Sequence, residues 1–133
     1  MAYSADQLQW LAATLKSAKG DVVLFSHQPL IGEYTAYNSA IVEDMLAAFQ
    51  NKTSYVNDAM GINVNFGSSD GNVLSFHAGH NHEYKASYSS NAVLWQIVSG
   101  AAWTDVVTAS ENVVRKFSYG SADIKTYYYP DIG

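Results

Sequence analysis

The chain has 133 residues and a formal net charge of −5, from seven basic and twelve acidic residues. A length of this order is typical of one domain, so we expect residues 1–133 to form a single domain. Apolar residues make up 48% of the sequence and charged residues only 14%. This composition excludes a disordered chain and a coiled coil, and the scattered Lys and Arg residues argue against nucleic-acid binding.

Membrane and thiol chemistry are also constrained by the sequence. No apolar run approaches the roughly 18 residues that a membrane-spanning helix needs, so we expect no membrane association. The first residues lack the basic start and apolar core of a signal peptide, and the cellular compartment stays unknown. The absence of cysteine excludes a disulfide, a thiolate nucleophile and a cysteine-based zinc site. Metal binding or acid–base chemistry must therefore come from four histidines and twelve acidic residues.

The beginning of the chain predicts a helix followed by a strand. Ser4 and Gln7 match a capping box, and apolar residues at helical spacing follow as far as Gly20, which can end the helix. Residues 22–25 (VVLF) form a continuous apolar run, typical of an interior strand that is covered on both faces. Pro29 then biases the residue before it away from a helix, so a loop follows the strand.

The rest of the chain predicts one more helix and several strands. The helix is expected over residues 38–50, and the mostly irregular stretch 51–72 contains one short strand at 62–66. Apolar strands follow at residues 73–76 and 92–98. The last part of the chain is expected to form an antiparallel meander, with strands at residues 106–108, 113–119 and 124–129. This order of elements predicts an α/β fold, with two helices on a mixed sheet that ends in the meander.

Three histidines follow the two buried strands. His27 lies just after the first apolar strand, and His80 and His82 lie just after the second. Sites in open α/β sheets lie beyond the carboxyl ends of the strands, so neighbouring strands would bring these imidazoles together. Imidazole is a common ligand of zinc, iron and nickel, and Gly79 would let the backbone turn sharply beside an ion. The pattern therefore indicates a metal site with three histidine ligands.

Other interpretations of the same residues remain open. His27 could cap a turn, while His80 and His82 could bond to loop carbonyls. His77 lies on the strand itself, which favours a packed histidine over a metal ligand. Glu83 could orient an imidazole from outside the metal shell, and a solvated loop acid is the simpler interpretation.

Several motifs give the sequence a family resemblance. The motifs QLQWL, VVLFSHQPL and GHNH lie at residues 7–11, 22–30 and 79–82. In order and separation they resemble the C-terminal half of calcineurin-like metallophosphoesterases. The stretch RKFSYGSAD, at residues 115–123, resembles the ending of secreted and phage-associated members. The resemblance covers nearly the whole chain and implies half of a layered α/β/β/α sandwich.

The resemblance also implies a reaction and a set of ligands. Two metal ions would bridge a phosphoester, and a metal-bound hydroxide would attack it in line. By position, His27 and His80 would bind one metal and His82 the other, and Asn81 is the variable residue between the two histidines. Divalent Mn, Fe, Ni and Zn all suit such a site, so the identity of the metal stays open.

The chain departs from the family in its missing motifs. The first half of the family fold supplies Asp-x-His, Gly-Asp-x-x-Asp and Gly-Asn-His-Asp/Glu, and none of these occurs here. Without a bridging carboxylate, nothing holds two cations roughly 3.5–4 Å apart against their repulsion. Without the catalytic histidine, nothing obvious protonates the leaving oxygen. We therefore expect the C-terminal part of a phosphoesterase that is inactive by itself.

Half of such a sandwich is expected to associate with another polypeptide. It would expose an apolar sheet face and an unpaired strand edge, both of which favour association. We expect either a two-fold homodimer or a separate polypeptide that supplies the N-terminal half, with a phosphoester as substrate only in the completed enzyme. The alternative function is a non-catalytic binding or assembly module with vestigial histidines.

Overall fold

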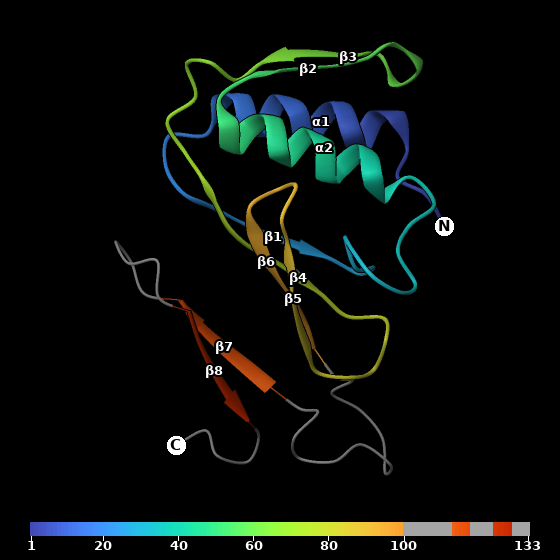
Figure 1. Ribbon diagram of the computed structural model, residues 1–133, viewed down its shortest axis with the longest axis vertical. Helices are drawn as coiled ribbons and strands as arrows, with labels where there is room; N and C mark the ends of the chain where they lie inside the picture. Colours follow the sequence, from blue (N-terminus) through green and yellow to red (C-terminus); the bar gives the residue numbers. More distant parts are fainter. Residues whose placement is uncertain (100–112, 118–123, 129–133) are drawn as a thin grey trace.

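The computed structural model describes residues 1–99, 113–117 and 124–128 and places two helices between β layers (Figure 1). The helices are α1 (Ala5–Ser17) and α2 (Ser39–Asn51). They cover one face of a sheet with the strand order β1 (Val22–Ser26), β4 (Val73–Ala78), β6 (Leu94–Val98) and β5 (Lys85–Ser89). A hairpin lies on the other side of the helices and comprises β2 (Ser54–Asn57), the 3-10 turn η1 (Asp58–Met60) and β3 (Ile62–Asn65). A second hairpin contains β7 (Val113–Phe117) and β8 (Ile124–Tyr128).

The four-stranded sheet is mixed. Strands β1, β4 and β6 run parallel to one another, and β5 is antiparallel to β6. Ser26 at the end of β1 lies opposite Ala78 at the end of β4, so the loops that follow these two strands leave the same edge of the sheet. The predicted α/β fold, with two helices on a mixed sheet and an antiparallel pair of strands near the end, is confirmed.

Helix α1 begins as predicted and ends earlier than predicted. The Ser4 hydroxyl accepts a hydrogen bond from the Gln7 backbone N–H, and the Gln7 side chain accepts one from the Ser4 N–H. The helix ends at Ser17, because Ala18 already has an extended backbone that directs the chain towards β1. The prediction that Gly20 ends the helix was therefore wrong.

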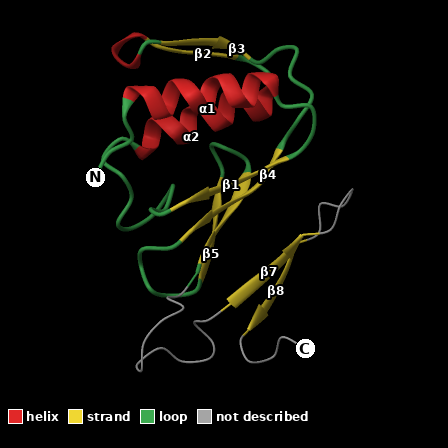
Figure 2. Ribbon diagram, turned by 180° about the vertical axis from the view of Figure 1, so that it is seen from behind, coloured by secondary structure: helices red, strands yellow, loops and turns green. Residues whose placement is uncertain are grey.

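The core lies between the helices and the sheet. Of the two helices, α2 contributes the larger number of buried apolar side chains, and the inward face of the sheet contributes Phe76, Leu94 and Val98. Removing each such side chain from water contributes roughly 1.5–3 kcal/mol. Alternate residues of the central strands point the other way, and the described helices do not cover that face (Figure 2).

Two strands of the described structure carry no clear sequence pattern. Strand β2 lies in the stretch expected to be irregular, and β5 is an edge strand rich in exposed, small and polar residues. Neither shows the apolar run or strict alternation by which strands are predicted. The predicted strand at 106–108 lies outside the described residues. Neither described helix has the length of apolar sequence required to cross a lipid bilayer.

The close approach of two glycines provides a test of this fold. A Cβ atom added at Gly71 would overlap the Gly20 carbonyl oxygen, whereas one added at Gly20 meets no atom within 4 Å. We predict that Gly71→Ala lowers the free energy of unfolding by about 1–3 kcal/mol, since overpacking has costs of that size. Gly20→Ala should leave it nearly unchanged. Urea denaturation measures both values, and equal stabilities would contradict this packing.

Candidate metal centre

His27 and His80 come together where β1 and β4 end. Each follows its strand within two residues, and the Gly79 backbone N–H donates to the His27 carbonyl oxygen at 3.1 Å, which joins the two loops. The His80 Nδ1 and His27 Nε2 atoms lie 3.1 Å apart, and the rings meet edge to face with centroids 5.0 Å apart. Residues that are 53 positions apart in the sequence thus share one hydrogen bond.

The separation of these nitrogens suits a shared cation. Two imidazole nitrogens at about 2.1 Å from a tetrahedral metal lie about 3.4 Å from each other. The observed 3.1 Å is within a few tenths of an ångström of that value. In this contact, one of the facing nitrogens donates a hydrogen bond to the other. To bind a cation, the donor ring would have to carry its proton on the opposite nitrogen, so that both lone pairs face the ion.

The other predicted residues of this loop do not join the pair to make a larger metal-binding cluster. His82 and Glu83 are exposed, and Asn81 is half-buried with its Oδ1 atom buried and without a hydrogen-bond partner. Across residues 1–99 and the two later strands, no group of three or more His, Cys, Asp and Glu side chains could hold a metal ion. Of the three imidazoles expected at this edge, the structure brings two together.

His77 lies within β4 and faces away from the helices. Its Nε2 atom is 2.8 Å from the Ser75 hydroxyl, and its ring stacks on Phe25 with centroids 5.2 Å apart. The residue is only 3% exposed. This environment is that of a packed, hydrogen-bonded histidine, as the sequence favoured.

The histidine loop adopts an unusual backbone conformation. His80 and His82 have φ values of 67° and 55°, and Tyr34, whose ring lies edge-on to His80 at 6.0 Å, has a φ of 56°. The left-handed region costs most residues roughly 1–2 kcal/mol, and such strain concentrates at functional sites. Gly79, at which a sharp turn was expected, has no such φ. The left-handed conformations of this loop lie at His80 and His82.

Gln96 positions the loop that carries His27, and sequence reasoning missed it. Its buried side-chain oxygen accepts hydrogen bonds from the backbone N–H groups of Leu30 and Ile31, at 2.6 and 2.9 Å. Its amide nitrogen donates to the Ile31 carbonyl oxygen at 3.0 Å. The available signal was a single polar residue in the apolar strand LWQIV. A buried glutamine in such a run needs partners, and the loop after His27 supplies them.

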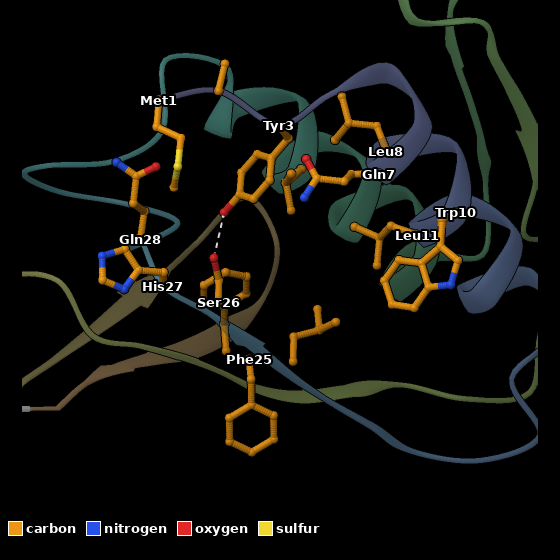
Figure 3. Close-up of a pocket in the computed structure, with 14 residues that line it drawn as sticks. Met1, Tyr3, Gln7, Leu8, Trp10, Leu11, Phe25, Ser26, His27 and Gln28 are labelled. Carbon is orange, nitrogen blue, oxygen red and sulfur yellow. Dashed lines mark hydrogen bonds between the residues drawn. The ribbon is translucent and has the colours of Figure 1, made fainter.

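A pocket of about 390 Å³ lies beside His27, between α1 and β1 (Figure 3). Leu8, Trp10 and Leu24 contribute to its apolar lining. The Tyr3 hydroxyl, which is 2.9 Å from the Ser26 hydroxyl, contributes a polar group near the end of β1. The pocket therefore combines apolar walls with a polar end that includes His27.

Comparisons with known proteins support the fold. No family model matches the chain, and no curated protein is significantly similar to it. Among solved structures it is similar to a dimetal phosphatase from Danio rerio, with a TM-score of 0.53 and 24% sequence identity. The match covers 83% of this chain and 28% of that one, so the chain spans little more than a quarter of the phosphatase. This likeness establishes a phosphoesterase-like fold.

The donor set described here accounts for only part of a two-metal centre. His27 and His80 offer two imidazole nitrogens with spacing suited to one cation. Two metal ions held side by side require further ligands, above all a carboxylate that bridges them. In the described part of the chain no acidic side chain forms such a group with the histidines. The described residues thus do not by themselves fit a complete dimetal site.

Replacing Gln96 tests its positioning role. We predict that Gln96→Leu lowers the free energy of unfolding by about 2–4 kcal/mol, because the buried Leu30 N–H and the half-buried Ile31 N–H lose their acceptor. Amide hydrogen exchange at Leu30 and Ile31 should accelerate. The matched control is Gln9→Leu, which removes an exposed bond to the Met60 carbonyl and should have little effect. Unchanged exchange at Leu30 would contradict this role.

Proposed function

We propose that the chain is the C-terminal portion of a calcineurin-like, metal-dependent phosphoesterase, in which His27 and His80 bind one divalent cation. The observation that carries the proposal is the 3.1 Å contact between their ring nitrogens, at the ends of neighbouring parallel strands. The similarity of the fold to a dimetal phosphatase supports it. Strain at His80 is consistent with a functional role for its position.

The remaining ligands would come from outside this set of residues. In the proposed enzyme, His82 binds the second metal, and acidic side chains from an N-terminal half bridge the two ions. Two imidazoles are neutral ligands and leave the charge of a divalent cation uncompensated, so the completing segment must supply carboxylates. The chain alone is therefore expected to bind metal and not to hydrolyse phosphoesters.

The edge of β1 is the proposed place for the completing half. Strand β1 is the outer strand of the described sheet, although its sequence VVLFS is typical of an interior strand. Beside it lies the pocket, and Trp10 at this pocket is 66% exposed. An apolar edge strand next to an apolar pocket favours the addition of another strand. A strand added here would bring its side chains next to His27.

The first test is metal binding by the isolated chain. We predict that Zn²⁺ or Mn²⁺ raises the melting temperature, because a ligand that binds only the folded state stabilises it. His27→Ala and His80→Ala should each abolish this gain. The control His82→Ala should keep it, since the 3.1 Å contact joins the other two rings. A melting temperature that no metal changes would instead support the assembly module with vestigial histidines.

The second test restores the acidic ligands. We predict that joining this chain to an N-terminal segment with the Asp-x-His, Gly-Asp-x-x-Asp and Gly-Asn-His motifs yields metal-dependent hydrolysis of bis(4-nitrophenyl) phosphate. The same fusion with His80→Ala should lose at least 10²-fold in rate, since a ligand of the reactive ion is gone. A folded, metal-loaded fusion without turnover would refute the phosphoesterase assignment while leaving metal binding intact.

A further inference from the structure

Tyr34 lies beside the histidine pair and outside the hydrophobic core. Its ring meets the His80 ring edge to face, with centroids 6.0 Å apart and ring planes at 65° to each other. The residue is nevertheless 65% exposed. An aromatic side chain is therefore held at the candidate metal centre while much of its surface stays open to solvent.

The loop that carries Tyr34 connects β1 to α2 and is anchored on both sides of this residue. Before it, the Leu30 backbone N–H donates to the buried Gln96 side-chain oxygen at 2.6 Å. After it, Ala36 is only 2% exposed and is packed into the protein. The two anchors fix the path of the loop, so that the residues between them, Tyr34 included, stay at the surface next to His80.

The backbone of Tyr34 adopts a conformation that favours glycine. Its φ is 56°, and glycine itself occupies such a position two residues earlier, at Gly32, with a φ of 91°. A bulky residue with a positive φ is an outlier among proteins, and strain of this kind concentrates at ligand-binding and catalytic sites. Neither burial nor backbone preference accounts for a tyrosine at position 34.

An aromatic ring at this position adds a flat apolar surface to the cation site. Aromatic rings pack on one another edge to face or offset-stacked, with centroids about 4.5–7 Å apart. Tyrosine provides this contact area at a low cost in entropy, because its side chain has few rotatable bonds. Since Tyr34 already contacts His80, an aromatic group joined directly to a phosphate at the histidine pair lies within its reach.

We propose that Tyr34 is a specificity-determining residue, whose ring packs against the aromatic group of an aryl phosphoester bound at His27 and His80. The inference rests on the proposed function, because the cation bound by the two histidines places the phosphate. Tyr34 contacts the part of the ester that does not react. A contact of this kind favours one ester over another without taking part in the reaction.

Binding of two phosphonates to the zinc-loaded chain tests this role. Phenylphosphonate and methylphosphonate share the phosphonate group, and only the first carries a ring. Neither is hydrolysed, so the measurement does not require an active enzyme. We expect the chain to bind phenylphosphonate about fivefold or more tightly than methylphosphonate, as measured by ligand-observed NMR titration.

Variants of two tyrosines separate ring packing from other effects. Tyr34→Ala should reduce the preference for phenylphosphonate to less than about twofold, and Tyr34→Phe should keep it, since ring packing does not need the hydroxyl. Tyr37→Ala is the matched control and should also keep it, because Tyr37 belongs to the same loop and is 92% exposed. Tyr34→Gly should lose the preference without lowering the melting temperature, because glycine readily adopts a positive φ.

The rise in melting temperature that Zn²⁺ produces is measured on the same samples. If zinc stabilises the chain but the two phosphonates bind equally or not at all, the role of Tyr34 is wrong and the metal site stands. A preference that Tyr34→Ala retains has the same meaning. If Tyr34→Ala abolishes the stabilisation by zinc, Tyr34 positions His80 and the specificity role is wrong. If zinc does not stabilise the unmodified chain, the proposed function fails, and this inference fails with it.

Discussion

The parallel pairing of β1 with β4 is the interaction on which the candidate site depends. It places Ser26 opposite Ala78, so that the following loops leave the sheet together and the Gly79 N–H reaches the His27 carbonyl oxygen. Both histidines then need only a short loop to meet. A shift of one residue in this register would turn the side chains of one strand to the opposite face and separate the rings. The helices stabilise the register by packing on the inward-facing residues of both strands.

The histidine pair and its surroundings define what the chain contributes and what it lacks. The two facing nitrogens are 3.1 Å apart, a spacing that suits one cation, and Gln96 holds the loop that carries one of them. Neutral imidazoles cannot balance two divalent ions, so a two-metal reaction needs acidic groups from another segment. The similarity to a dimetal phosphatase, over 28% of that protein's length, concerns the fold.

Two surfaces of the sheet carry apolar side chains of the kind that proteins usually bury. The edge of β1 lies beside an apolar pocket next to His27, and the sheet face that points away from the helices carries exposed Phe25 and Trp95. A strand edge and a sheet face are covered in different ways. A strand edge satisfies its backbone groups by strand addition, whereas a sheet face is covered by side-chain packing. The completing half of the enzyme is proposed to add a strand at the edge of β1.

The sequence by itself determined the local elements: the capping box at Ser4, the apolar runs of β1 and β4, and the positions of histidines just after those strands. These features follow from periodicity and capping, which act over a few neighbouring residues. Only the tertiary structure decided which histidines meet, because ring positions depend on strand register and on the left-handed backbone of His80. It also decided the role of Gln96, because the partners of this buried side chain are backbone N–H groups of a loop that is distant in the sequence.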